Sequence, residues 1–427
     1  MNKSERWLKL DNAAKVFPYI SSKSFANVFR LSVNLKEDIN KNIMQKAIDD
    51  IKSRFPMFFV KMRVGAFWYY YEQNERKFVL KKESPFIGSF KNRNKNNGYL
   101  IEMFYYKNRF SIEVFHAVSD AFGTLELLKS ILYRYFQLLE KDIKNDDNII
   151  KYDSNVGSLE LEDSFNKHYR NLPKSYHRYK PEKAYKIKGD EFFVPGNGVI
   201  IGKLNSKTLY ELSKKYNCTV TQYLSALIIE SIYTYMINYQ TKNDKPITVV
   251  LPVNMRKYLE SETLRNFSLY IYLVQKIKDK DEIKLEDFIN SIKNCYNEQL
   301  NLENLKSTLY ANMEIEKNTF LKYCPLLLKL FAVKLGYNSI AGGLQTVSFS
   351  NLGVLKGFDV FHDLIYDVEF IACGTESSHS ICACTYNDVT TISFSRSICS
   401  TEIEMEFFRK LSENCDIEIT SNLWEEN

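Results

Sequence analysis

One histidine is placed where acid–base chemistry could occur. The chain has only five histidines in 427 residues, and one of them, His116, precedes Asp120 by four residues and Gly123 by seven. An imidazole has an unperturbed pKa of about 6.5 and can take and return a proton at physiological pH. The aspartate can cap the following helix or bind an arginine, and the glycine frees the turn. A packed histidine without a catalytic role also fits this spacing.

No nucleophile is tied to His116 by a motif. The sequence contains no GxSxG elbow, no cysteine in a protease-like context, no P-loop and no GxGxxG fingerprint. A histidine that acts alone as general base suits the direct transfer of a group from one bound substrate to another. This is the chemistry that the residues around His116 indicate.

The elements on either side of His116 would hold it at a strand end. Two extended runs, YLIEMFYY and RFSIEVFH, flank the short turn Lys107-Asn108 and predict a hairpin whose second strand delivers His116. Large apolar residues then recur at spacings of three and four over residues 125–139, which predicts a helix. The segment therefore has the pattern strand, tight connection, helix.

Other segments also have clear periodicity. Helices are predicted at residues 37–55, at 220–239 with Thr221 as a cap, and at 285–300. A hairpin is expected around Gly65, and strands in VIIGKL, in ITVVLPVNMR up to Pro252, in QTVSFSNLG and in VTTISFSR. The apolar segment 322–337 fits a core helix better than a helix lying on a membrane. A polar, weakly periodic stretch at 140–198 suggests two domains, residues 1–175 and 176–427.

Composition indicates a globular protein and gives no sign of nucleic-acid binding or of a membrane span. Hydrophobic residues make up 45% of the chain, and the formal charge of +6 is spread over 58 basic and 52 acidic residues. Because the charges are interspersed, we expect no nucleic-acid partner. The beginning of the chain does not resemble a secretory signal, and no apolar run reaches the ~18 residues of a membrane span. We therefore expect a cytoplasmic protein without a transmembrane segment.

The cysteines suggest neither disulfides nor a metal site. All eight lie between Cys218 and Cys415 without framework spacing. Cys382 and Cys384 form a CxC pair near Cys373 and His379, but this spacing fits no common zinc pattern. We interpret HSICACTY as a buried strand and expect no metal.

Several stretches carry a family resemblance. FHAVSDAFGTLELLKSIL, residues 115–132, resembles the HHxxxDG motif of the acyltransferase superfamily with the chloramphenicol acetyltransferase fold, which includes condensation domains. The alcohol acetyltransferase-like group is the most similar. WLKLDNAAKVFP, LPVNMRKYLESETLRNF, VSFSNLG and TISFSRSICSTEIEMEFFRKL resemble further segments of that group, in family order and over nearly the whole chain.

The resemblance implies an α/β fold of two chloramphenicol-acetyltransferase-like lobes, each a mixed sheet flanked by helices, with a tunnel between them. An acetyl-CoA or other acyl-CoA would enter from one side and an alcohol or amine acceptor from the other. His116 would be the general base. Asp120 would pair with an arginine and serve structure; Arg256 is the candidate, with Arg265 and Arg396 left open.

Two more residues and two departures follow from the resemblance. Ser350 and Asn351 in SNLG either contact the oxyanion or acyl donor, or simply end a strand and form its turn. The first histidine of the motif is Phe115 here, which is harmless because the second is the catalytic one. The motif glycine is Ala121 here, and alanine disfavours the positive φ that such a turn could require.

Three functions are consistent with these observations. The first is an acyl-CoA-dependent O- or N-acyltransferase, expected to act as a monomer without a metal. The second is a condensation-type enzyme that takes acyl groups from an acyl carrier protein, a function that we expect less because the given sequence contains no carrier domain. The third is a catalytically silent relative that only binds, a reading raised by Ala121.

Overall fold

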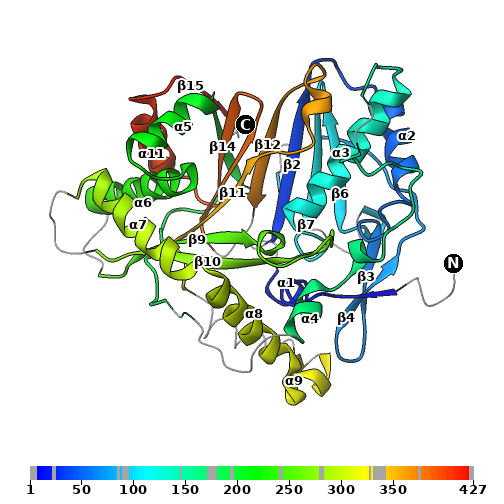
Figure 1. The fold of residues 1–427 in the computed structure, drawn as a ribbon, viewed down its shortest axis with the longest axis horizontal. Helices are drawn as coiled ribbons and strands as arrows, with labels where there is room; N and C mark the ends of the chain where they lie inside the picture. The colour runs from blue at the N-terminus through cyan, green and yellow to red at the C-terminus, as the bar shows by residue number, and fades with distance from the viewer. Residues whose placement is uncertain are drawn as a thin grey trace.

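The computed structural model describes residues 7–21, 26–83, 87–88, 96–144, 147–170, 179, 181–192, 197–239, 244–277, 283–326, 328–329, 343–373 and 377–422. Within this part of the chain, helices and mixed sheets form two lobes that stand side by side (Figure 1). The predicted α/β class, with mixed sheets flanked by helices, is confirmed.

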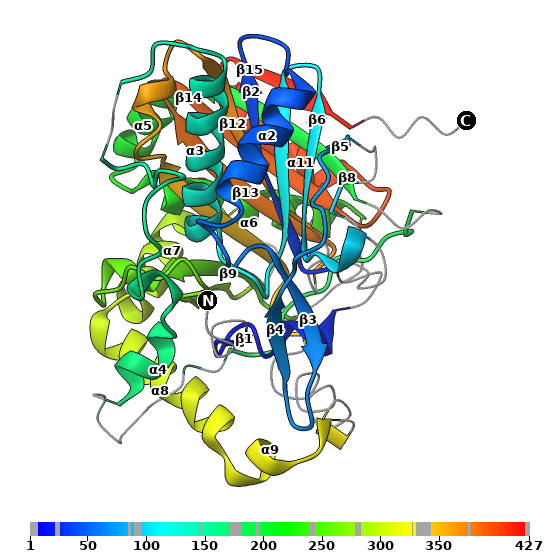
Figure 2. The same ribbon diagram turned by 90° about the vertical axis from the view of Figure 1, so that its right-hand side faces the viewer.

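The first lobe is built on a five-stranded sheet. Its strands lie in the order β12-β2-β7-β6-β5: Ile365–Cys373, Val28–Leu35, Arg109–Phe115, Ile101–Tyr106 and Lys81–Lys82. β6 and β7 form the predicted hairpin, and β5 joins β6 in parallel. Two helices, α2 (Lys41–Ile51) and α3 (Ala121–Leu138), pack together over one face of this sheet (Figure 2).

Local capping sets the start of both helices, and the helix predicted over 37–55 is shorter at both ends, from Lys41 to Ile51. The side chain of Asn40 accepts hydrogen bonds from the backbone N–H groups of Asn42 and Ile43, so α2 starts at Lys41. The side chain of Asp120 accepts from the N–H of Gly123, so α3 starts directly after the motif aspartate. The helix predicted over 125–139 is therefore one turn longer at its N-terminus.

The second lobe is built on a seven-stranded sheet. Its order is β10-β9-β11-β13-β14-β8-β15, with β10 at Ser268–Gln275, β9 at Ile247–Asn254, β11 at Val347–Val354, β13 at His379–Tyr386, β14 at Val389–Arg396, β8 at Gly198–Asn205 and β15 at Ile417–Ser421. β11 runs parallel to both of its neighbours. The helices of this lobe include α5 (Ser206–Lys215), α6 (Val220–Tyr239), α7 (Leu285–Gln299) and α11 (Glu402–Ser412).

Smaller elements complete the described chain. A three-stranded sheet, β1-β4-β3, joins Trp7–Lys9 to the predicted hairpin around Gly65, which consists of Val60–Val64 and Tyr69–Gln73. The short helices α1 (Phe17–Ile20), α4 (Ser164–Tyr169) and α9 (Thr319–Tyr323) and the longer α8 (Leu302–Lys317) lie toward the bottom of Figure 1. Most of the predicted helix at 322–337 lies outside the described residues.

One strand from the later part of the chain, β12, belongs to the sheet of the first lobe. β12 follows β11 in sequence, yet it pairs antiparallel with β2 and forms the edge of the first sheet, from Ile365 opposite Leu35 to Cys373 opposite Val28. The other edge of β12 faces β14, where hydroxyl groups of Thr391, Ser393 and Ser395 donate to carbonyl oxygens of β12. The division at residue 175 stays a prediction, and β12 is the strand of residues 176–427 that completes the first sheet.

Two local predictions were wrong. Pro252 does not end its strand, because β9 continues to Asn254. β9 pairs with β11 only at Val249 and Val250. Beyond Val250, the side of β9 that faces β11 is a sheet edge. The N–H that proline lacks therefore interrupts no ladder of hydrogen bonds there. Thr221 lies inside α6, and it is the Oγ1 of Thr219 that accepts from the N–H of Gln222.

Candidate active site

His116 directly follows the last residue of β7. Its backbone N–H donates to the carbonyl oxygen of Asn27 at 2.9 Å, which extends the pairing of β7 with β2 by one step. The half-buried imidazole stacks on Phe17, with ring centres 4.7 Å apart, and meets the edge of Phe29 at 5.2 Å. Two aromatic rings and a strand end therefore restrict how the imidazole can turn.

The surroundings keep this imidazole neutral. Burial lowers the pKa of His116 from its usual value, because the charged form loses hydration. Hydrogen bonds to its own backbone and to Asn266 and the charge of Asp120 act in the opposite direction without cancelling the effect of burial. At neutral pH the ring is thus unprotonated and able to accept a proton, as a general base must.

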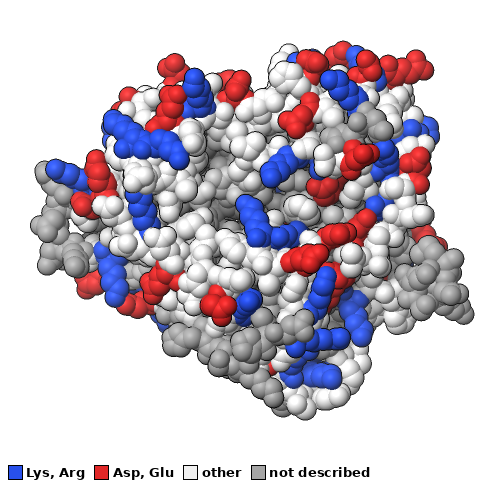
Figure 3. Space-filling view, viewed as in Figure 1, with Lys and Arg blue, Asp and Glu red and all other residues white. Residues whose placement is uncertain are grey.

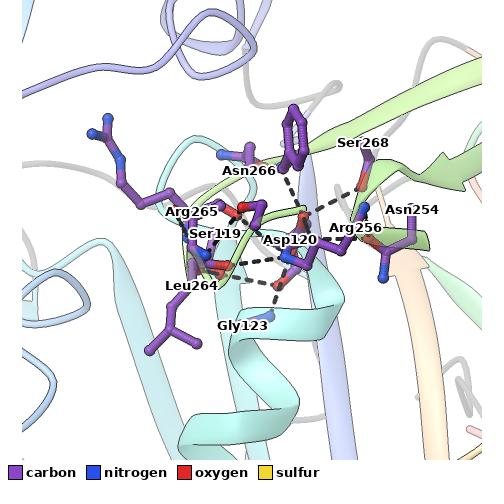
Figure 4. Close-up of polar contacts among 12 residues, drawn as sticks. Ser119, Asp120, Gly123, Asn254, Arg256, Leu264, Arg265, Asn266 and Ser268 are labelled. Atoms are coloured by element: carbon purple, nitrogen blue, oxygen red, sulfur yellow. Dashed lines mark hydrogen bonds and ion pairs between the residues drawn. The ribbon is translucent and has the colours of Figure 1, made fainter. Parts of the chain in front are cut away.

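Asp120 lies at the centre of a dense set of hydrogen bonds that does not include His116 (Figure 4). Its Oδ2 accepts from Arg256 Nη1 at 2.8 Å and from the N–H of Phe267 at 2.9 Å, and Oδ1 accepts from the N–H of Gly123 at 3.2 Å. Both Asp120 and Arg256 are buried to about the same degree. Asp120 is therefore fixed by hydrogen bonds from three parts of the chain and does not contact His116.

Of the three arginines considered as partners, Arg256 is the one that meets Asp120. It projects from the short 3₁₀ turn Met255–Lys257 that follows β9, and its guanidinium lies over the ring of Phe122, 4.4 Å from the ring centre. Arg265 instead faces Asp11 at 3.5 Å, and Arg396 faces Glu404 at 3.6 Å.

Ala121 and Gly123 have conformations that sequence alone did not predict. Ala121 is the first residue of α3 and takes a helical conformation, so this loop needs no positive φ at the position of the motif glycine. Gly123 is required for space and not for φ. A Cβ at Gly123 would collide with the carbonyl oxygen of Leu264 and with Ser119 Oγ, which itself donates to that carbonyl at 2.6 Å.

Ser350 and Asn351 lie in the middle of β11, not at its end. The amide of Asn351 is engaged within the second lobe, since Nδ2 donates to Thr221 Oγ1 at 3.1 Å and Oδ1 accepts from the N–H of Gly353 at 2.8 Å. No hydrogen bond of the Ser350 hydroxyl is found within the described chain. The structure does not join either residue to His116.

Asn266 is the site residue that sequence analysis missed. Its Oδ1 lies 3.1 Å from His116 Nδ1, and its Nδ2 donates to the carbonyl oxygen of Ala117 at 3.3 Å. It belongs to the stretch LPVNMRKYLESETLRNF that carries part of the resemblance, but no spacing rule connects it with a histidine 150 residues earlier. Its only sequence signal was its place in that stretch.

The cysteine pair lies in the core. Cys382 and Cys384 are fully buried on β13, and burial raises the pKa of each thiol, that of Cys384 to about 12. Such thiols are poor ligands and poor nucleophiles because both roles require the thiolate. Within the described residues no group of three or more histidine, cysteine or acidic side chains is arranged to hold a metal ion.

Two cavities in the described chain lie away from His116. The larger, about 1090 Å³, is a groove between the two sheets lined by Arg30, Lys203, Asp367 and neighbouring residues. The smaller lies against the three-stranded sheet and includes Trp7 and Tyr70. Neither is lined by His116, so the tunnel at this histidine stays a prediction.

Comparisons with known proteins agree on the fold. No family model matches the sequence, and no curated protein matches it. Among solved structures, polyketide synthase associated protein 5 from Mycobacterium tuberculosis matches with a TM-score of 0.61 at 14% identity, over 94% of this chain and 96% of that one. Trichothecene 15-O-acetyltransferase from Fusarium sporotrichioides matches with a TM-score of 0.60 at 12% identity, over 97% and 95%.

A third match is the starter condensation domain of rhizomide synthetase, solved as a mutant with C8-CoA and Leu-SNAC. Its TM-score is 0.59 at 10% identity, over 96% of this chain and 95% of that one. The chain therefore has the two-lobed fold shared by condensation domains and chloramphenicol acetyltransferase-like acyltransferases. The resemblance that the motifs indicated is confirmed at the level of this superfamily fold.

Proposed function

We propose that the chain is an acyl-CoA-dependent acyltransferase that moves an acetyl or other acyl group to an alcohol or amine, with His116 as general base. The observation that carries this proposal is a neutral imidazole, held by a strand end and two aromatic rings, at the motif position of an acyltransferase fold. The narrower assignment to the alcohol acetyltransferase-like group belongs to the same proposal.

The reaction requires one proton transfer in each direction. His116 Nε2 takes the proton of the acceptor hydroxyl as the acceptor oxygen attacks the thioester carbonyl carbon. The tetrahedral intermediate then collapses, the carbon–sulfur bond breaks, and the CoA sulfur leaves with the proton returned from Nε2. Base assistance of this kind is worth ~10²- to 10⁴-fold in rate.

The developing oxyanion needs a hydrogen-bond donor, and Ser350 is our candidate. Asn351 is less suited, because both ends of its amide already have partners in the second lobe. The hydroxyl of Ser350 has no such engagement in the described chain. A good donor to an oxyanion contributes ~10²-fold or more in rate, so Ser350→Ala should lower kcat by that order if the candidate is right.

The decisive assay incubates the protein with acetyl-CoA and a mixture of alcohols and amines and follows products by mass spectrometry. Parallel reactions supply the acyl group on an acyl carrier protein, because one structural neighbour is a condensation domain. Product with CoA and loss of product in His116→Ala by two to four orders of magnitude support the proposal. Transfer only from the carrier protein favours the condensation-type alternative, and no transfer from either donor favours a silent binding relative.

The proposal extends to the localisation, oligomeric state and partners of the protein. No helix in the described residues combines the length and apolarity needed to cross a bilayer. Lys and Arg are interspersed with Asp and Glu on the face shown in Figure 3, without a field of one sign. We propose a cytoplasmic, monomeric enzyme whose partners are the acyl donor and a small acceptor.

A further inference from the structure

The amide of Asn266 stands between the imidazole of His116 and the buried groups behind it. We propose that Asn266 positions His116 by accepting a hydrogen bond from the Nδ1–H of the imidazole, which leaves Nε2 as the base. The Asp120–Arg256 pair assists the reaction by holding the backbone on both sides of Asn266. This inference deepens the proposed function and rests on it. It gives the motif aspartate a reason to be present although it does not touch the histidine.

A carbonyl oxygen determines which way the amide points. Nδ2 of Asn266 donates to the carbonyl oxygen of Ala117 at 3.3 Å. Since a carbonyl oxygen can only accept, the NH₂ end must face Ala117 and Oδ1 must face His116 Nδ1.

An oxygen opposite Nδ1 selects the tautomer. The Oδ1 of a neutral amide only accepts, so the ring nitrogen 3.1 Å away must carry the proton. Nε2 is then left with its lone pair, which is the form of the ring that can take a proton from an acceptor hydroxyl.

The segment that carries Asn266 is anchored on both sides. Before it, the carbonyl oxygen of Leu264 accepts from Ser119 Oγ at 2.6 Å, and the carbonyl oxygen of Arg265 accepts from Arg256 Nη2 at 2.5 Å. After it, the N–H of Phe267 donates to Asp120 Oδ2 at 2.9 Å. The loop after His116 and the turn after β9 thus hold this segment together, and Figure 4 shows Asp120 at the centre of these bonds.

The charged groups that face this arrangement are Asp11, Asp120, Arg256 and Arg265. Arg256 engages Asp120, and Arg265 faces Asp11 at 3.5 Å while donating to the carbonyl oxygen of Lys9 at 2.5 Å. Burial raises the pKa of Asp11 to about 6 despite the attraction of Arg265. The carboxylate of Asp11 is therefore mostly ionised near pH 7 and becomes protonated below about pH 6.

The first test is spectroscopic and uses a variant only to assign the signal. In the intact protein labelled with ¹⁵N-histidine, five imidazoles give few enough signals to assign His116 with the His116→Ala spectrum. We expect the neutral ring of His116 to carry its proton on Nδ1, whereas free imidazole rings favour Nε2. A neutral ring protonated on Nε2 would overturn the inference, whether or not the enzyme is active.

The second test replaces the amide by an apolar side chain of similar size. Asn266→Leu removes the acceptor whose hydrogen bond raises the pKa of His116. We expect the midpoint of the kcat/KM–pH profile to move to lower pH by roughly half a unit or more, and kcat to fall ~10- to 100-fold with little change in KM. A loss of stability alone would not move the midpoint.

A matched control separates positioning from general damage. Asn254 accepts from Arg256 at 3.1 Å but does not contact the imidazole, so Asn254→Leu should lower the melting temperature and leave the pH midpoint in place. If Asn266→Leu does not fold, the smaller Asn266→Ala is measured in the same way. An unchanged midpoint in the folded variant contradicts the inference.

A double-mutant cycle distinguishes this inference from the function on which it rests. If Asn266 acts through His116, Asn266→Ala should reduce the rate of the parent enzyme but not the residual rate of His116→Ala. Equal reductions in both backgrounds would reject the positioning role while leaving His116 as the base. Parental rates in His116→Ala would reject the proposed function itself.

Discussion

At the scale of single residues, the proposed mechanism makes the rate depend on the protonation state of His116. Burial lowers the pKa of this imidazole. The ring must be neutral to accept a proton, so kcat/KM should rise with pH and reach a plateau, with a midpoint below the ordinary value of about 6.5. Rates measured from pH 5 to 9 at several acceptor concentrations test this prediction, and a midpoint above about 7 would contradict it.

Asp120 should matter for stability as well as for rate. Asp120→Asn leaves the buried guanidinium of Arg256 without its counter-charge, and breaking one side of a buried pair costs ~3 to 5 kcal/mol. We expect a lower melting temperature together with reduced kcat. Calorimetry and kinetics on the same preparation decide the point. Full loss of activity at an unchanged melting temperature would instead place the aspartate in the chemical step.

At the scale of elements, the start of α3 is limited by space. Gly123→Ala adds a methyl group where the carbonyl oxygen of Leu264 already lies, and backbone cannot move aside as a flexible side chain can. We expect Gly123→Ala to lower the melting temperature and the rate together, because the Leu264 segment leads to Asn266. Thermal unfolding and steady-state kinetics measure both effects.

The control for this variant is Ala121→Gly. Ala121 already has helical geometry at the first position of α3, so glycine should cost only ~0.5 to 1 kcal/mol through backbone entropy and should not speed turnover. Faster turnover in Ala121→Gly would mean that alanine restrains the loop after all. This outcome would revive the concern that the departure from the motif weakens activity.

At the scale of the whole molecule, β12 connects the lobes. It extends the first sheet through β2, and its other edge accepts hydrogen bonds from hydroxyl groups at every second residue of β14. Lys203 on β8 adds ion pairs to Asp367 at 2.9 Å and Glu369 at 3.2 Å. We expect these contacts to limit the width of the groove between the two sheets.

Removal of the hydroxyl groups should therefore loosen the two lobes. Each buried hydroxyl–carbonyl bond contributes ~0.5 to 1.5 kcal/mol. The carbonyl oxygen of Val368, which Thr391 bonds, also accepts from Cys384 Sγ at 3.2 Å, so the loss at Thr391 is partly offset. We expect the triple variant Thr391→Val, Ser393→Ala, Ser395→Ala to lose several degrees of melting temperature and to scatter X-rays as a more open particle. Thr390→Val, which loses only a bond to Thr385 within the sheet, is the control. An unchanged scattering profile of the folded triple variant would contradict this account.

The sequence by itself determined the local elements and the position of the histidine. The strand that ends at His116, the helix after it, α6 and α7 follow from apolar periodicity and caps, because these signals lie within one or two turns of chain. The motifs in family order also indicated the superfamily fold. The predictions that Thr221 caps α6 and that Pro252 ends β9 were wrong. Thr219 caps the helix instead, and β9 continues past Pro252 because β11 no longer pairs with it there.

Only the tertiary structure decided which distant groups meet. Arg256 lies 136 residues from Asp120 and Asn266 lies 150 residues from His116, and periodicity carries no information over such separations. Arg256 was the candidate from the resemblance, but Arg265 and Arg396 stayed open until the turn after β9 placed Arg256 at the start of α3. The sequence likewise does not show which sheet β12 joins. That choice depends on which sheet has a free edge beside β12 once both sheets are packed together.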